Sequence, residues 1–241
     1  MLGRILITGL TAGLLAGLFA AAIQISWITP IIQQAEIYES AEAPTGAADP
    51  ISRPGASVAH PAVLAAAEHA QEDAGAWAPE DGIERTLFTV LANVLTGVGF
   101  GLILVAAVTL SGRKVDPRRG VLWGLAGFAV FALAPALGLA PELPGLVAAD
   151  LGARQTWWIG TVISTASGLA LIVFARHRLL KGLGLALLLA PHVIGAPHPG
   201  QFGLKVPGEL AAEFAVASLF TAALFWTALG GIAGYFHRKL S

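Results

Sequence analysis

The sequence predicts an all-α integral membrane protein, a bundle of about six transmembrane helices in which the fifth is short or broken. Three observations predict this class. Hydrophobic residues make up 56% of the 241 residues and charged residues only 12%, whereas a soluble domain carries about 25% charge. The apolar residues gather in long runs, and five of these reach or approach the roughly 20 residues that cross a bilayer as a helix. The charged residues lie between the runs, with basic and acidic segments alternating along the chain.

Six apolar runs define the predicted helices. The fifth run is the short one, and it carries His192. Small residues recur at intervals of four within the runs, as Gly9, Gly13 and Gly17 do in the first, and this spacing predicts close contacts between helices. The runs comprise residues 5–29, 87–110, 121–140, 157–174, 183–195 and 211–236.

The positions of the basic residues predict the topology. Ten of the fourteen Lys and Arg residues lie before the first run, between the second and third, between the fourth and fifth, or after the sixth. Because Lys and Arg concentrate in cytoplasmic loops, both termini are predicted to be cytoplasmic. Every Asp and Glu except Asp116 lies on or near the opposite side. Cleavage of the first run as a signal peptide is disfavoured, because the run continues through Trp27 and its loss would leave an odd number of spans.

We expect residues 1–241 to form a single transmembrane domain with an outward-facing acidic loop at about residues 30–84. The Ala-rich part of this loop, residues 61–73, predicts a short helix and contains His69 among acidic neighbours. Either a weak divalent-cation site or a solvated acidic loop explains that composition, and both raise the local cation concentration. The chain has no Cys, so a metal ion would be held by His, carboxylate, backbone or water.

The end of the fifth run is the first candidate site. Three prolines and a glycine lie between residues 191 and 199, and this density predicts that a regular helix is not sustained there. The freed carbonyls then need water, a neighbouring side chain or an ion, and broken helices build ion sites in many transporters. His192 and His198 supply imidazole nitrogens, which suit Co, Ni, Zn and Cu. The alternative is a re-entrant cap whose histidines bond to backbone or water.

Two pairs of carboxylates are further candidates. Glu209 and Glu213 are four residues apart at the start of the sixth run, so both face one way, and an intramembrane carboxylate is a functional hypothesis. Glu209 is also explained as a charge that favours the helix dipole. Glu36 and Glu39 follow the first run and share a face if that helix continues; the alternative is a solvated helix end at the membrane interface.

Two other polar features have structural interpretations. Glu84 and Arg85, just ahead of the second run, are expected to pair locally where that helix begins. Asn93, inside the run, is expected to make an interhelical hydrogen bond rather than to bind a ligand.

Several functions are excluded or disfavoured. There is no basic arm or patch for nucleic acid and no phosphate-binding loop. A membrane-embedded hydrolase is disfavoured because no nucleophile lies beside a base. We therefore expect no enzymatic activity and no tightly bound cofactor.

The motifs together resemble one family. The quoted segments are TPII (29–32), AEIYE (35–39), WAPEDGIERT (77–86), LANVLTG (91–97), WGLAGF (123–128) with Pro135, PELPG (141–145), WW (157–158), PHVIGAP (191–197) and PGELAAEF (207–214). The chain resembles the CbtA family of predicted bacterial cobalt transporter subunits over nearly its whole length. The resemblance implies a cobalt uptake component that works with CbtB, a small one-helix partner with a histidine-rich metal motif.

The leading hypothesis is a multi-pass permease subunit of the bacterial inner membrane that takes up a divalent transition-metal cation. Co²⁺ is placed ahead of Ni²⁺ and Zn²⁺ as the transported substrate, a CbtB-type one-helix subunit is the expected partner, and a homo-oligomer stays open. The alternative is a non-transporting scaffold that positions a metal-transport partner. The candidate metal-binding residues are His192, His198, Glu209, Glu213, Glu36, Glu39 and His69.

Overall fold

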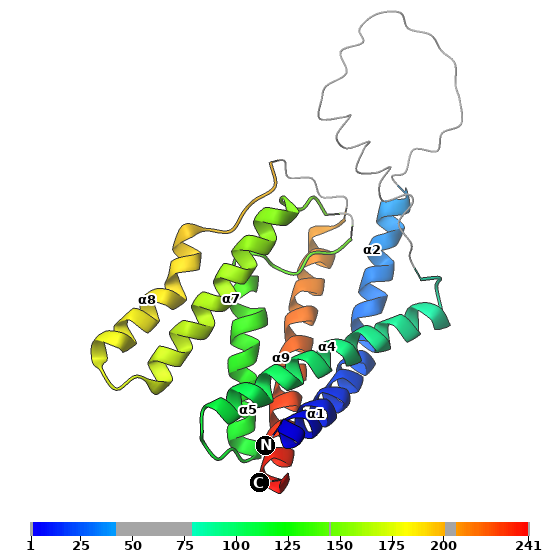
Figure 1. The fold of residues 1–241 in the computed structure, drawn as a ribbon. Helices are drawn as coiled ribbons and strands as arrows, with labels where there is room; N and C mark the ends of the chain where they lie inside the picture. The colour runs from blue at the N-terminus through cyan, green and yellow to red at the C-terminus, as the bar shows by residue number, and fades with distance from the viewer. Residues whose placement is uncertain (1, 42–78, 145, 201–205, 241) are drawn as a thin grey trace, which may run out of the picture.

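The computed structural model describes residues 2–41, 79–144, 146–200 and 206–240. Its helices follow the predicted runs (Figure 1). The first is continuous but has three parts, and the third also has three. The bounds are α1 Leu2–Ile23, η1 Gln24–Ile28, α2 Thr29–Ala41, α4 Ile83–Leu110, α5 Pro117–Phe128, η2 Ala129–Leu133, α6 Ala134–Ala136, α7 Leu151–Phe174, α8 Arg178–Ile194 and α9 Gly208–Leu240.

Five helical segments in the described part are long and apolar enough to cross a membrane. The remaining apolar helix is α8, which has 17 residues and corresponds to the run predicted to be short. Figure 1 places both ends of the chain at one end of the bundle. We call this the termini end and the opposite one the far end.

The distribution of side chains is that of a membrane protein. Large apolar side chains face outward along the helices, for example Leu95, Leu122 and Ile163, each more than 60% exposed. The interior is made largely of small residues, and Ala12 and Ala16 are fully buried. Helices in lipid associate through close packing of small residues rather than by hiding apolar surface from water. The exposed apolar surface is therefore the lipid-facing surface.

Glycines set two close helix contacts. In the α1–α4 contact, a Cβ atom on Gly17 would lie 2.6 Å from the carbonyl oxygen of Asn93. In the α5–α9 contact, a Cβ atom on Gly234 would lie 2.6 Å from the carbonyl oxygen of Asp116. Both separations are too short for any side chain, so the glycines allow the two backbones to touch. The four-residue glycine spacing thus marks the contact face, as the sequence predicted.

Two π-helical segments precede prolines inside membrane helices. η1 is followed by Thr29 and then Pro30, and η2 is followed by Ala134 and then Pro135. In each, the residue before the proline donates its N–H to the carbonyl five residues back. A proline has no N–H and its ring clashes with the preceding turn, and one wider turn absorbs both effects. The first helix therefore passes Pro30 and continues to Ala41, into the segment expected to be loop.

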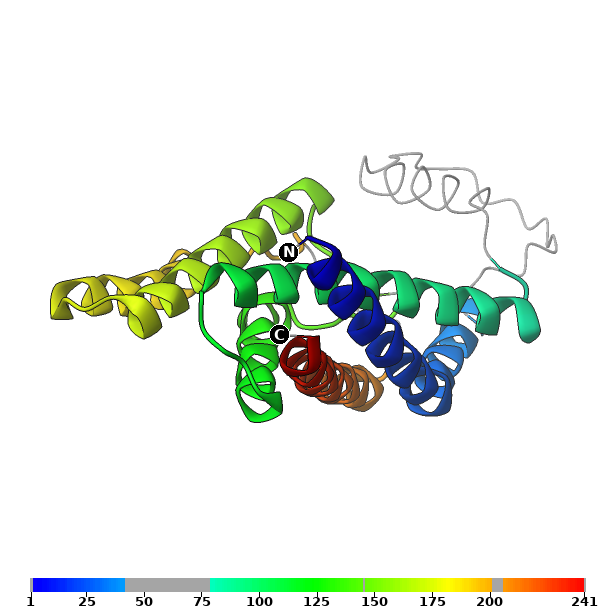
Figure 2. The same ribbon diagram turned by 60° about the horizontal axis from the view of Figure 1, so that its bottom comes forward.

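The α7–α8 hairpin lies at one side of the bundle, and the views in Figure 1 and Figure 2 agree on this. Contrary to expectation, α8 passes through Pro191 and ends at Ile194. Pro191 leaves the carbonyl of Leu187 without its normal intrahelical donor. The Ser164 hydroxyl of α7 donates to that carbonyl at 2.7 Å. A neighbouring side chain therefore satisfies the freed carbonyl, and the regular helix breaks only at Gly195 and beyond.

Candidate functional site

The predicted ligand residues within the described chain lie toward the far end of the bundle. There α2 ends, α7 and α9 begin, and α8 gives way to an irregular segment (Figure 1). The start of α4 lies lower in this view and contacts α2 through Arg85 and Glu36. His69 lies outside the described residues. Glu39 is within helix α2, but its side chain lies outside what the structure describes.

Glu36 forms a two-pronged ion pair with Arg85. The two guanidinium nitrogens of Arg85 donate to the two carboxylate oxygens of Glu36 at 3.1 and 2.5 Å. Arg85 also lies 3.2 Å from the exposed carboxylate of Asp81. The expected local pairing of Glu84 with Arg85 is wrong: Glu84 accepts the backbone N–H of Glu80 at 3.3 Å. The pair fastens α2 to α4, and a metal ion at Glu36 would compete with Arg85.

An amide pair lies farther along the same two helices. Asn93 of α4 donates from Nδ2 to Oε1 of Gln24, the first residue of η1, at 2.8 Å. The same nitrogen donates to the carbonyl of Thr89 at 2.8 Å. The predicted interhelical role of Asn93 is confirmed. Both groups are partly buried, and their bond holds the π-helical segment against α4.

A second Arg–Glu pair was not singled out from the sequence. Arg154 of α7 lies 2.8 Å from Glu142, in the segment after α6, and both side chains are 31% exposed. The pair borders a cavity of about 620 Å³ that Ser218 of α9 also lines. The sequence did hold a signal for this pair: Glu142 follows the third apolar run and Arg154 precedes the fourth, so both lie on the same predicted side. Among the described residues, the carboxylates of Glu36, Asp81 and Glu142 therefore form ion pairs with arginine.

His192 lies in the last turn of α8 and is partly buried. Its ring meets that of Trp157 edge to face, with centroids 6.2 Å apart. The indole Nε1 of Trp157 is buried and has no hydrogen-bond partner among the residues that the structure describes. His198 is exposed in the irregular segment after α8. The contact with Trp157 therefore orients the ring of His192, whereas His198 lies beyond the end of the helix.

Glu209 and Glu213 lie on an exposed stripe of α9. The adjacent face of this part of α9 is buried through Leu210 and Ala217, which pack in the cluster that contains Ile31 of α2. Neither carboxylate forms an ion pair within the described residues. Their shared face is the one that sequence spacing predicted, and it points away from the chain's own core.

These residues do not converge on one site within the described chain. No three or more His, Asp or Glu side chains in that part are grouped closely enough to hold a metal ion. The structure brings Glu36 to Arg85 and His192 to Trp157, and leaves Glu209 and Glu213 outward. The metal-ligand assignment therefore remains a prediction.

The termini end is basic and has a different local chemistry. Asp116 is the N-cap of α5 and accepts the backbone N–H of Arg119 at 2.9 Å. That hydrogen bond lowers the pKa of Asp116 below its ordinary value, because it stabilises the ionised form. The cap explains why the one acidic residue that departs from the charge pattern stands among basic residues.

Comparison with known families supplies the identification. The profile of the family described as "Probable cobalt transporter subunit (CbtA)" matches residues 2–238. No curated protein and no solved structure matches the chain. The family match spans nearly the whole chain and agrees with a multi-pass helical fold. The chain therefore belongs to the CbtA family of probable cobalt transporter subunits.

Proposed function

We propose that this protein is the membrane permease subunit of a bacterial inner-membrane system that takes up a divalent transition-metal cation. Co²⁺ is the first candidate, and Ni²⁺ and Zn²⁺ are the alternatives. The observation that carries the proposal is the family match over residues 2–238, supported by five apolar helices. A transport role requires no chemical step, in agreement with the expectation of no enzymatic activity. Both termini are proposed to face the cytoplasm, because the basic loops lie on the same side as the termini and Lys and Arg concentrate in cytoplasmic loops.

The proposed ligands lie where an entering ion would arrive. His192, His198, Glu209 and Glu213 belong to elements at the far end, which is the outer side in the proposed orientation. Imidazole and carboxylate groups suit divalent transition metals, and exchange among several weak ligands permits release as well as capture. In this scheme, Glu36 and Glu39 of α2 are further ligands at the outer side. A cation binds Glu36 only after Arg85 has been displaced.

A one-helix partner subunit completes the proposed site. The observation that supports this is the outward stripe of Glu209 and Glu213, together with the lack of a three-ligand group in the described chain. A partner helix against α9 supplies further donors to these carboxylates. The membrane potential, negative inside, favours inward movement of the cation.

The test is uptake of ⁵⁷Co²⁺ by cells that lack their own cobalt importers. The chain is expressed alone and with its candidate one-helix partner, at matched levels. Partner-dependent uptake is expected, with a large loss in His192→Ala and in Glu213→Ala. The matched control is His177→Ala, because His177 is exposed and lies at the other end of α8. Competition by unlabelled Ni²⁺ and Zn²⁺ defines the substrate.

The alternative role is a scaffold that positions a transporting partner. It is favoured by the absence of three clustered ligands in the described part of the chain. A scaffold predicts that His192→Ala and Glu213→Ala still co-purify with the partner and leave uptake intact. If no combination transports cobalt, nickel or zinc above the empty vector, the permease proposal fails.

A further inference from the structure

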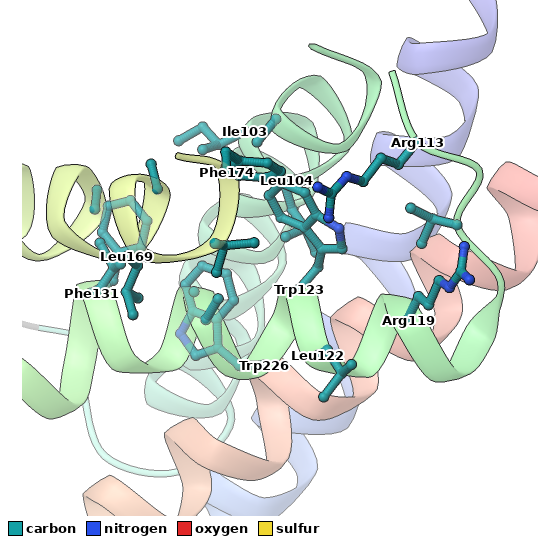
Figure 3. Close-up of a pocket in the computed structure, with 18 of the residues that line it drawn as sticks. Ile103, Leu104, Arg113, Arg119, Leu122, Trp123, Phe131, Leu169, Phe174 and Trp226 are labelled. Atoms are coloured by element: carbon teal, nitrogen blue, oxygen red, sulfur yellow. The ribbon is translucent and has the colours of Figure 1, made fainter. Parts of the chain in front are cut away.

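An open groove of about 940 Å³ runs between α4, α5 with η2, and α7. Figure 3 shows that its two ends differ: Arg113 and Arg119 lie at one, and Phe131 and Leu169 lie at the other. The arginines belong to the α4–α5 turn and the first turn of α5. The groove therefore has a cationic head at the termini end and a long apolar body. The cationic head is formed by Arg113, Lys114 and Arg119, all of which line the groove.

The body of the groove is hydrocarbon-like and accessible from the side. Apart from the cationic head, its lining consists of aliphatic and aromatic residues, with one glycine. Ile103 and Val173 line it and are 52% and 56% exposed. A surface of this kind on a membrane helix faces acyl chains rather than water. The groove is thus shaped to receive a hydrocarbon chain that enters from the bilayer.

Within the described residues, the positive charge of the cationic head is offset only by Asp116, which interacts electrostatically with Arg119. None of its three residues forms an ion pair with a carboxylate within the described residues. Arg113 holds its guanidinium 4.7 Å from the ring centroid of Phe174, at the edge of the apolar body. Arg119 donates from Nη1 to the carbonyl of Lys114 at 3.1 Å. This hydrogen bond holds the two residues of the cationic head close together. The adjacent carboxylate, Asp116, caps α5 through the backbone N–H of Arg119.

We propose that this groove binds one anionic phospholipid. Its phosphate lies against Arg113, Lys114 and Arg119, and its acyl chains follow the apolar body toward Phe131. The head stands just beyond the end of α4 and at the start of α5, which is the level of the lipid headgroups. Basic pockets between membrane helices on one side of the bilayer are suited to anionic headgroups. This inference does not depend on the identity of the transported ion.

A phospholipid fits these observations better than a partner helix. All the charged residues that line the groove are basic and lie at one end. A phospholipid has the matching arrangement, with one anionic headgroup at the end of its apolar chains. A free phosphate would use the cationic head but would not need the apolar body. The proposal therefore makes separate predictions for the head and for the body.

The experiment is native mass spectrometry of the full chain purified in neutral detergent, titrated with phosphatidylglycerol, phosphatidylcholine or inorganic phosphate. One phosphatidylglycerol is expected to bind in preference to the other two. The variant Arg113→Gln/Arg119→Gln should weaken its binding about ten-fold or more, because it removes two of the three cationic side chains that attract the anionic headgroup. The matched control Arg176→Gln/Arg178→Gln removes two charges from the α7–α8 turn, outside the groove lining, and should bind like the parent.

A second pair of variants tests the apolar body. Ala170→Phe fills the groove from α7 and leaves the cationic head intact, while Ala186→Phe adds the same bulk to an exposed position on α8 outside the groove lining. Ala170→Phe should lose the bound phospholipid and Ala186→Phe should retain it. Equal binding in both charge variants, no effect of Ala170→Phe, or equal binding of inorganic phosphate would overturn the proposal. So would occupancy of the groove by the one-helix partner with no bound lipid.

Discussion

The substitution Gly97→Ala tests the glycine contact between α1 and α4. A Cβ atom at Gly97 would overlap the carbonyl oxygen of Gly13 and lie 3.0 Å from the Cα of Gly17, whereas ordinary contact begins at 3.4 Å. These neighbours are backbone atoms, so no side chain can rotate away. The two helices must separate by at least a few tenths of an ångström at Gly17 and by more at Gly13.

The cost of that separation follows from the loss of dispersion contacts. Opening a contact by about 0.5–1 Å forfeits a quarter to a half of an attraction of about 0.1–0.2 kcal/mol per atom pair. Summed over the helix contact, overpacking of this kind typically costs about 1–3 kcal/mol. The same helix offers a matched control in Gly99, where an added Cβ meets nothing within 4 Å. Gly99→Ala receives the same gain in helix propensity, about 1 kcal/mol, so the difference between the variants isolates packing.

The assay is equilibrium unfolding in mixed micelles, in which a denaturing detergent is titrated and helix content is followed by circular dichroism. Gly97→Ala should be less stable than Gly99→Ala by about 1–3 kcal/mol. Equal stability of the two variants would show that α1 and α4 are not in backbone contact, and would refute the packing argument.

Three further predictions concern polar contacts. Ser164→Ala should lower the free energy of unfolding by about 1–2 kcal/mol because it leaves the partly buried carbonyl of Leu187 without a donor. Adding Pro191→Ala should restore it, since the new N–H replaces the lost donor. In a double-mutant cycle, Glu36→Gln and Arg85→Gln should show a coupling of about 1 kcal/mol, as befits a two-pronged but partly exposed pair. The pKa of Asp116 is lower in the folded state than in the unfolded state, where it is near 3.8. The contribution of Asp116 to the free energy of unfolding is therefore fully present above the unfolded pKa, and it is lost as the pH falls through the folded pKa. Asp116→Asn should remove that part of the pH dependence in acid unfolding.

Local composition was enough to predict the class and most of the helices. Hydropathy and segment length identify membrane helices because an unpaired backbone is too costly in lipid for other structures. The passage of the first helix beyond Pro30 was not predictable from the proline alone. Proline usually ends a helix, and here the wider turn of η1 accommodates it because the surrounding helices hold that turn in place.

In the candidate site, too, the sequence predicted which residues share a helix face but not which residues pair with each other. The spacing of Glu209 and Glu213 placed both on one face, since a helix has a fixed period. The partner of Arg85 was misassigned because Glu36 is 49 residues away in the chain, and only the packing of α2 on α4 brings the charges together. The sequence by itself determined the membrane class, the apolar segments and the helical faces, because these depend on local hydrophobicity and geometry. Tertiary structure alone decided which charges are paired, which carbonyl Ser164 satisfies and where the cationic groove lies, because each depends on contacts between distant helices.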